Sequence, residues 1–173
     1  IHDRVLAGNW SAGAGRLRTG QTWIRRRDDG QVVFTPPPAD AVAKLVDSIC
    51  RAASDRKQHP ALTAAWIHVA LAAVHPFQDG NGRTARVLAS LAMYRGGFRS
   101  RAFTSLEEWW GRHPADYYAA FDCLGAEFDQ RTDVTEFIRS HVAAQVSQIR
   151  ALDLRERSTR GLWVAFENIL ADK

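Results

Sequence analysis

The chain has 173 residues, of which 46% are hydrophobic and 24% are charged, the composition of an ordinary globular protein with one domain. No run of the sequence reaches the roughly 20 apolar residues that a membrane-spanning helix needs, and no signal peptide opens it. The formal net charge of +4 permits nucleic-acid binding without arguing for it. Together with the two lone cysteines, these features predict a cytoplasmic protein without membrane attachment.

The first predicted element is a β-hairpin within residues 22–35. Two short β-prone runs, at 23–24 and 32–34, flank a turn that contains Gly30, and the prolines at 36–38 end the second run. A single hairpin on a helical body has no sheet to join, so its strand edge is available. Such an edge is either a plain surface loop or a binding edge for an extended peptide. The residues that present it are Val32, Val33 and Phe34.

Three helical segments follow the hairpin. Residues 40–53 carry apolar side chains at three-four spacing, which predicts a helix that is apolar on one side. Residues 61–75 are apolar on nearly every side, which is typical of a helix in the middle of a bundle. A second apolar helix is predicted for residues 83–94, ended by a left-handed cap at Gly96-Gly97.

A long helix is predicted to begin near Asp133 and Glu136, and a last amphipathic segment to follow at 159–170. The buried face of the long helix is expected to hold Phe137, Ile138, Val142, Val146 and Ile149. The sequence therefore predicts an all-α bundle with one short hairpin. We expect the chain to consist of a domain of residues 1–150 and a C-terminal helical extension, 151–173, which packs loosely or starts a further module.

Chemically active side chains concentrate between the two apolar helices, in residues 75–86. Gly80 and Gly82 remove side chains where a ligand would touch the backbone, and N–H groups at a helix N-terminus bind anions. Arg83 and Arg86 lie one turn apart on the following helix, where two guanidinium groups suit a polyphosphate.

Two further residues of this loop suggest a reaction. Asp79 would be repelled by phosphates unless a cation lay between them, and Mg²⁺ is held in this way by one carboxylate plus phosphate oxygens and waters. His75 ends the buried helix and has an ordinary pKa near neutrality, which suits a base for an incoming hydroxyl group.

Three plainer interpretations compete. A calcium-binding EF-hand loop beginning at Asp79 fails, because its sixth position would be Thr84 and its twelfth Ser90. A tight hairpin at the Asp-Gly or Asn-Gly pair fails because both flanks are helical. An ordinary helix–loop–helix connection stays open, although two arginines, an aspartate and a histidine together argue against it.

The segment HPFQDGNGRTAR, residues 75–86, matches the Fic-domain signature at every fixed position: His, any residue, Phe, any residue, Asp or Glu, Gly-Asn-Gly-Arg, two residues, Arg. GRLR at Gly15–Arg18, the hairpin, FTPPP at Phe34–Pro38 and the helix before the motif also resemble segments of that family. The chain thus resembles the Fic family over residues 1 to about 150 and only loosely beyond.

The resemblance implies an all-α fold that transfers the AMP of ATP to a Ser, Thr or Tyr hydroxyl of a target protein and releases pyrophosphate. His75 would deprotonate the hydroxyl, Asp79 would hold Mg²⁺, and Phe77 would anchor the loop in the core. ATP would be the co-substrate. The implied phosphate ligands are Gly80, Asn81 and Gly82 as an anion cradle, with Arg83 and Arg86 on the β- and γ-phosphates.

The resemblance also assigns roles outside the motif. The hairpin resembles the family's flap, which holds a target segment by main-chain pairing. Tyr117 and Tyr118 stand where relatives place residues of the base pocket, although paired tyrosines on a helix also serve as core. His68 has no nearby Cys or second His to complete a metal set and is interpreted as packing. His141 is expected on or near the apolar face of the long helix.

Two rival functions remain. The same fold can perform other phosphate chemistry, with a different nucleotide, phosphocholine or a phosphate, or by removing AMP. The phosphorylating branch carries Lys at the position of Gly82, so Gly82 favours nucleotidyl transfer. The other rival is a catalytically silent nucleotide- or DNA-binding regulatory module, in which residues 25–27 touch nucleic acid. The intact His75 and both arginines of the motif argue against it.

The inhibitory motif of the family is Ser or Thr, three residues, Glu, then Gly or Asn, and this sequence lacks it. The only Glu followed by Gly or Asn is Glu167, and Trp163 stands at the required Ser or Thr position. Because the chain starts at Ile1 without a Met, we expect a fragment whose inhibitory segment lies upstream or on an antitoxin-like partner. The fragment is then expected to act without activation. A homodimer stays open.

Overall fold

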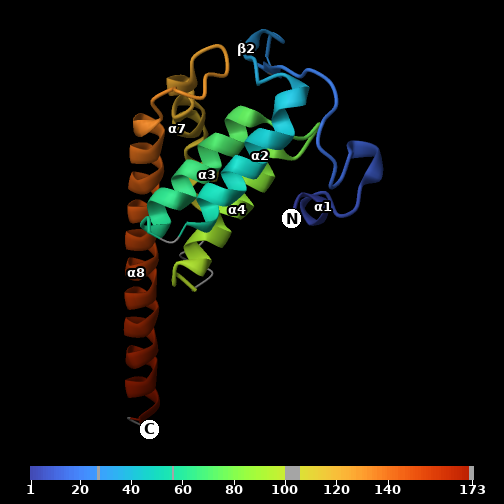
Figure 1. The fold of residues 1–173 in the computed structure, drawn as a ribbon. Coiled ribbons are helices and arrows are strands. Elements are labelled where there is room, and N and C mark those ends of the chain that lie inside the picture. Colours follow the sequence, from blue (N-terminus) through green and yellow to red (C-terminus); the bar gives the residue numbers. More distant parts are fainter. Residues whose placement is uncertain (27, 56, 100–105, 172–173) are drawn as a thin grey trace.

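The computed structural model describes residues 1–26, 28–55, 57–99 and 106–171. A helical bundle surrounds α3 (Pro60–Val74), which packs against α2 (Ala39–Ser54), α4 (Asn81–Arg95) and α8 (Thr135–Ala171) (Figure 1). The remaining elements are α1 (His2–Val5), the strands β1 (Ile24–Arg25) and β2 (Val32–Phe34), α6 (Glu107–Arg112), α7 (Pro114–Ala119), and 3₁₀ turns at Trp10–Ala12 and Asp122–Leu124. None of the helices described here has the length and apolar character to cross a membrane.

The position of α3 follows from its composition. Its buried side chains cover most of the helix surface, and the remaining side carries the exposed Leu62 and the half-buried Trp66 and Ala70. Val74 packs against α2, Ala64 packs against Ala89 and Met93 of α4, and Val69 packs against Phe137 of α8. The predicted helices at 40–53, 61–75 and 83–94 are confirmed to within two residues at each end. The all-α prediction with one hairpin is also confirmed.

The end of α4 shows why two glycines follow it. Gly97 is the left-handed residue, at φ 104°, whereas Gly96 has φ −80°. A Cβ built on Gly96 would lie 2.1 Å from Cγ of Pro60 at the start of α3. The need for glycine at position 96 is therefore steric.

We expect Gly96→Ala to lower the free energy of unfolding by about 1–3 kcal/mol, because the added methyl group overpacks the α3–α4 contact. Urea unfolding measures this change. Gly111→Ala is the matched control, since a Cβ at this exposed helical glycine meets nothing within 4 Å. Equal stability of the Gly96 and Gly111 variants would contradict the packing explanation.

The predicted hairpin is present, but it is not isolated. β1 pairs antiparallel with β2, and Val33 forms a bulge between the two register pairs. Directly after β2, Thr35 forms a parallel bridge with Glu127: its N–H donates to the carbonyl of Ala126 at 2.8 Å, and its carbonyl accepts from Phe128 at 3.0 Å. The sheet itself has two strands, as expected for a single hairpin, and the isolated bridge at Thr35 ties the residue after β2 to the segment before α8. Residue 27, within the hairpin, lies outside the described residues.

The long C-terminal helix begins as predicted. Asp133 caps it, accepting hydrogen bonds at Oδ1 from the N–H and the hydroxyl of Thr135 at 2.9 and 2.6 Å. It then runs without a break to Ala171, so no separate segment begins at 159. Residues 150–158 contain no Gly or Pro that would interrupt it. The domain boundary at 150, which falls inside this helix, stays a prediction.

The predicted buried face of α8 is wrong in part. Of its five apolar residues only Phe137 is fully buried, and Val146 is 41% exposed. The buried positions instead include His141, Gln145 and Gln148, which continue the helical spacing from Phe137. These polar side chains have partners: Gln145 bonds the His141 ring at 3.2 Å, and Gln148 donates to Glu108 at 3.1 Å. An apolar pattern alone could not identify this face.

Candidate active site

The predicted catalytic loop is a tight connection between α3 and α4. His75 closes α3 in the left-handed conformation, with φ 48° and ψ 59°, and Gly80 opens α4 with φ 77°. A non-glycine residue in this conformation costs on the order of 1–3 kcal/mol and persists only where its surroundings fix it. The first-turn N–H groups of α4 and the positive end of its dipole face this loop.

The His75 ring is set for accepting a proton. Nδ1 lies 3.3 Å from the carbonyl oxygen of Ala72, so the Nδ1–H form leaves the lone pair on Nε2. Burial lowers the pKa of His75; the carbonyl of Ala72 opposes this shift, and the positive charge of Arg18 adds to it. The imidazole is therefore neutral at physiological pH, as a general base requires.

The loop is braced from inside by Asn81. The Asn81 side chain, 3% exposed, accepts from the N–H of Phe77 at 2.9 Å and donates to the carbonyl of Phe77 at 2.8 Å. Phe77 itself is buried, as its predicted role as an anchor requires. The side chain of Asn81, predicted as part of the anion cradle, is thus engaged in holding the loop.

His2 is a second brace, which the sequence did not reveal. Its ring stacks on Phe77 with centroids 3.6 Å apart and an interplanar angle of 6°. Its Nε2 donates to the carbonyl of Asp79 at 2.9 Å, while Nδ1 accepts from the N–H of Gly15 at 3.0 Å. Nothing in the local sequence distinguishes this histidine from a surface one.

The two loop glycines differ in what a side chain would meet at each position. Gly80 has a left-handed φ, and a Cβ there would also lie 3.1 Å from Cδ2 of Leu6. Gly82 is helical, but a Cβ on it would lie 3.4 Å from Nη1 of Arg86 and 4.0 Å from the hydroxyl of Tyr117. The absence of a side chain at 82 therefore keeps the space beside Arg86 open.

Asp79 and Arg83 form an ion pair at the solvent edge of the loop. Nη2 of Arg83 lies 3.0 Å from Oδ2 of Asp79, and their side chains are 50% and 61% exposed. Oδ1 of Asp79 accepts from the N–H of Gly80 at 2.5 Å. An exposed pair of this kind contributes about 0–1 kcal/mol, so an incoming phosphate or cation can separate it.

The residues around Asp79 fit a Mg²⁺ ion that takes one protein carboxylate and completes its coordination with phosphate and water. Among the described residues, no group of three or more His, Cys, Asp or Glu side chains could hold a metal ion. A cation here would rely on the exposed Asp79 carboxylate together with phosphate oxygens and water, which is the coordination that Mg²⁺ prefers at nucleotide sites.

The two predicted base-pocket tyrosines differ in their surroundings: Tyr117 contacts Arg86, and Tyr118 is exposed. Nη1 of Arg86 donates to the hydroxyl of Tyr117 at 3.2 Å, and Nε2 of the buried His68 lies 3.3 Å from the same hydroxyl. Tyr118 is 68% exposed. Tyr117 therefore orients Arg86 beside Gly82, whereas Tyr118 faces solvent.

His68 lies in the core, as the sequence predicts. It contacts the rings of Phe137 and His141, and burial is the main cause that lowers its pKa, followed by the charges of His141 and Arg86. Burial also lowers the pKa of His141 to about 4. Both histidine rings are therefore neutral at pH 7, and the positive charge of this cluster is carried by Arg86.

Sequence reasoning missed Arg18, which lies at the base of the loop. It is 4% exposed, and within the described part of the chain its guanidinium group donates to main-chain carbonyls alone. One acceptor is the carbonyl of His75, at 2.8 Å from Nε. The GRLR segment that carries Arg18 resembles a segment of the family, but nothing in its sequence indicates a buried side chain.

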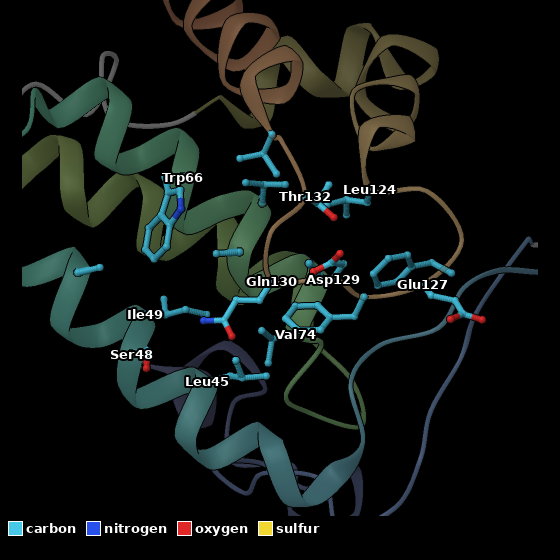
Figure 2. Close-up of a pocket in the computed structure, with 17 residues that line it drawn as sticks. Leu45, Ser48, Ile49, Trp66, Val74, Leu124, Glu127, Asp129, Gln130 and Thr132 are labelled. Carbon is cyan, nitrogen blue, oxygen red and sulfur yellow. The ribbon is translucent and has the colours of Figure 1, made fainter.

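The apolar pocket in Figure 2 is distinct from the predicted phosphate-binding loop, residues 75–86. Its volume is about 300 Å³, and it lies between α2, α3 and the segment before α8. Leu45, Ile49, Trp66 and Val74 project into it, and Glu127 and Asp129 lie at its edge. Its described lining contains no Arg, Lys or His, so a polyphosphate has no cationic partner there.

The fold and loop together define a class of protein: a helical bundle that holds a neutral histidine near the N-terminus of a helix that carries two arginines. The family model described as Fic/DOC family matches residues 1–93, more than half of the chain, and the chain belongs to this family.

Its adenylyltransferase relatives are longer proteins. The protein adenylyltransferase fic-1 of Caenorhabditis elegans is 40% identical over 101 residues, which are 57% of this chain and 18% of that protein. A Fido domain-containing protein of Dictyostelium discoideum is 37% identical over 80 residues, 43% of this chain and 56% of that protein. The chain spans about a fifth of the length of the adenylyltransferase relatives it matches.

Solved structures show the same architecture. A Fic family protein from Desulfovibrio desulfuricans G20 superposes with a TM-score of 0.72 at 25% identity, over 90% of this chain and 48% of the other. The Fic-1 structure from C. elegans superposes with a TM-score of 0.64 at 30% identity, over 91% of this chain and 42% of the other. The prediction of a Fic-type bundle is confirmed.

Proposed function

We propose that this domain is a Mg²⁺-dependent protein adenylyltransferase, which transfers AMP from ATP to a hydroxyl side chain of a target protein. The observation that carries the proposal is the neutral His75, with its lone pair on Nε2, beside the N-terminus of α4. The homology to protein adenylyltransferases over part of the chain supports it.

In the proposed reaction, Nε2 of His75 takes the proton of the target hydroxyl, and the hydroxyl oxygen attacks the α-phosphorus of ATP. The bond between the α-phosphorus and the bridging oxygen to the β-phosphate breaks, and pyrophosphate leaves. Backbone N–H groups at the start of α4 bind phosphate oxygens, and Arg83 and Arg86 bind the β- and γ-phosphates. Mg²⁺ held by Asp79 would neutralise charge on the phosphates.

The hairpin supports a role in binding the target. Val32 and Val33 are 39% and 40% exposed, and the bulge at Val33 lies within the short strand β2. A target segment in extended conformation can pair with this edge by main-chain hydrogen bonds. The Thr35–Glu127 bridge holds the end of β2 in place for such pairing.

Isotopically labelled ATP tests the proposal directly. The protein is incubated with Mg²⁺, a cell lysate and ATP labelled either at the α- or at the γ-phosphate, and labelled proteins, including the chain itself, are analysed by mass spectrometry. Label from the α-position together with an adenylyl adduct on Ser, Thr or Tyr is expected. Label from the γ-position alone would show phosphate transfer and exclude the proposed reaction.

The pH dependence of transfer follows from the environment of His75. Its pKa lies below the ordinary value of 6.5, and only the unprotonated ring accepts a proton. The rate should therefore exceed half of its plateau at pH 6.5 and fall as the pH drops through the lowered pKa. kcat/KM for protein labelling between about pH 5 and 8 measures this, with the fold checked by circular dichroism at each pH. A rate already half lost at or above pH 6.5 would contradict a lowered pKa.

A further inference from the structure

The guanidinium group of Arg18 joins two parts of the molecule that are far apart in sequence. On one side it holds the end of α3, where Nε donates to the carbonyl of His75 at 2.8 Å and Nη2 lies 3.4 Å from the carbonyl of Val74. The backbone N–H of Arg18 adds a bond to the carbonyl of Pro76 at 2.9 Å. Three successive carbonyls at the left-handed turn are thus held by one residue.

On the other side Arg18 holds both ends of the hairpin. Nη1 donates to the carbonyl of Gly20 at 2.9 Å, and Nη2 donates to the carbonyl of Pro37 at 2.5 Å. These two residues lie just outside the predicted flap, residues 22–35, one before it and one after it. Gln21 ties the same two chain segments by donating to the carbonyl of Pro36 at 3.0 Å.

A buried cation with such partners is unusual, and its electrostatics explain why it is stable. Among the described residues, no carboxylate forms an ion pair with Arg18. Its charge is balanced instead by carbonyl dipoles, including the negative end of the α3 dipole. Burial lowers the pKa of Arg18, but a guanidinium group has so high an ordinary value that it keeps its charge. The planar fork of donors serves acceptors on both sides at once, which a lysine ammonium cannot do.

We propose that Arg18 is a positioning residue that couples the flap hairpin to the catalytic turn, so that the segment that binds the target and the histidine that deprotonates it are held in one geometry. The inference rests on the proposed function for its catalytic consequence. Its structural part, the coupling of two segments through one side chain, stands on the hydrogen bonds alone.

Arg18→Lys keeps the charge and loses the fork, and Arg18→Met loses both. Arg16→Met is the matched control, because Arg16 is exposed and lies two residues away in the same segment. Hydrogen exchange, read by mass spectrometry on the protein without nucleotide, reports the coupling independently of activity. In the Arg18 variants, amides of residues 20–37 and of residues 75–80 should both exchange about tenfold faster or more, whereas the control should match wild type.

Kinetics give the second readout. For the Arg18 variants, kcat of target labelling should fall by about a hundredfold, because displacing the base by about 1 Å can lower the rate by this factor. ATP affinity should stay within about twofold, since the phosphate-binding groups belong to α4. NMR titration should also show the pKa of His75 raised in Arg18→Met, because a nearby positive charge has been removed.

Faster exchange in only one of the two segments would overturn the coupling, and so would wild-type exchange in Arg18→Lys. If Arg18→Met fails to fold, the Lys variant, which retains the buried charge, decides the question. If the wild-type protein transfers no AMP, the proposed function fails while the exchange experiment still tests the coupling.

Discussion

Replacing His75 by Asn should lower the rate of AMP transfer by about a hundred- to ten-thousand-fold, the contribution of a positioned general base. Asn is chosen because it tolerates the left-handed backbone that His75 adopts, with φ 48°, so the turn should keep its shape. The amide has no lone pair of comparable basicity and cannot take the proton of the target hydroxyl. Initial rates of protein labelling, measured at saturating ATP and Mg²⁺, give the effect.

ATP binding separates this role from a structural one. The groups proposed to bind the phosphates lie in α4 and its first turn, so the Asn variant should bind ATP with an affinity close to that of wild type. His75→Ala should behave in the same way, with some loss of stability at the turn. Labelling by either variant at a near-normal rate would remove His75 from the mechanism.

Asp79→Asn should lower Mg²⁺-supported transfer by about a hundredfold or more, because charge neutralisation at transferring phosphates contributes several kcal/mol. Asn retains an oxygen that can accept from the N–H of Gly80, as Oδ1 of Asp79 does. It loses the negative charge that pairs with Arg83. Loss of that exposed pair should change the free energy of unfolding by less than about 1 kcal/mol.

Calorimetry distinguishes a metal-binding role from a general effect on the loop. Mg²⁺ should strengthen the binding of a non-hydrolysable ATP analogue to wild type and should not do so for Asp79→Asn. Asp47→Asn is the matched control, because Asp47 forms an exposed pair with Arg51 at the same helical spacing, away from the loop. Equal Mg²⁺ enhancement in wild type and Asp79→Asn would exclude the carboxylate as a ligand.

The helices could be predicted because their signals are local, and the residues proposed to bind phosphate are local as well. The apolar character of α3 is contained in fifteen consecutive residues, and the loop chemistry in twelve. Asp79 and Arg83 pair across one turn, and His75 lies at the other end of the same short loop. A contact that spans so few residues depends little on the rest of the fold.

The supports of the loop could not be predicted because they come from distant segments. Arg18 and His2 reach it across 57 and 77 positions of sequence, and a single Arg or His carries no periodic signal. The pairing of Thr35 with Glu127 has the same character, since a one-residue bridge leaves no alternating pattern. The prediction of the buried face of α8 failed for another reason: hydrogen-bonded glutamines occupy positions where the pattern assumes apolar side chains.

The continuity of α8 has a consequence for helix formation itself. Beyond Gln148 the helix runs for roughly 35 Å more at 1.5 Å per residue, and Figure 1 shows this half extending past the other helices. Its described side chains from Asp153 to Val164 are exposed, and the pair between Arg155 and Glu108 ties only its beginning to α6. An isolated helix of this length would bear the cost of nucleation alone. Here the packed half of α8 supplies the nucleus, so each further residue adds only a propagation step, whose free-energy change is close to zero. Helical order in this half therefore decays with distance from the bundle, and temperature sets how far it reaches.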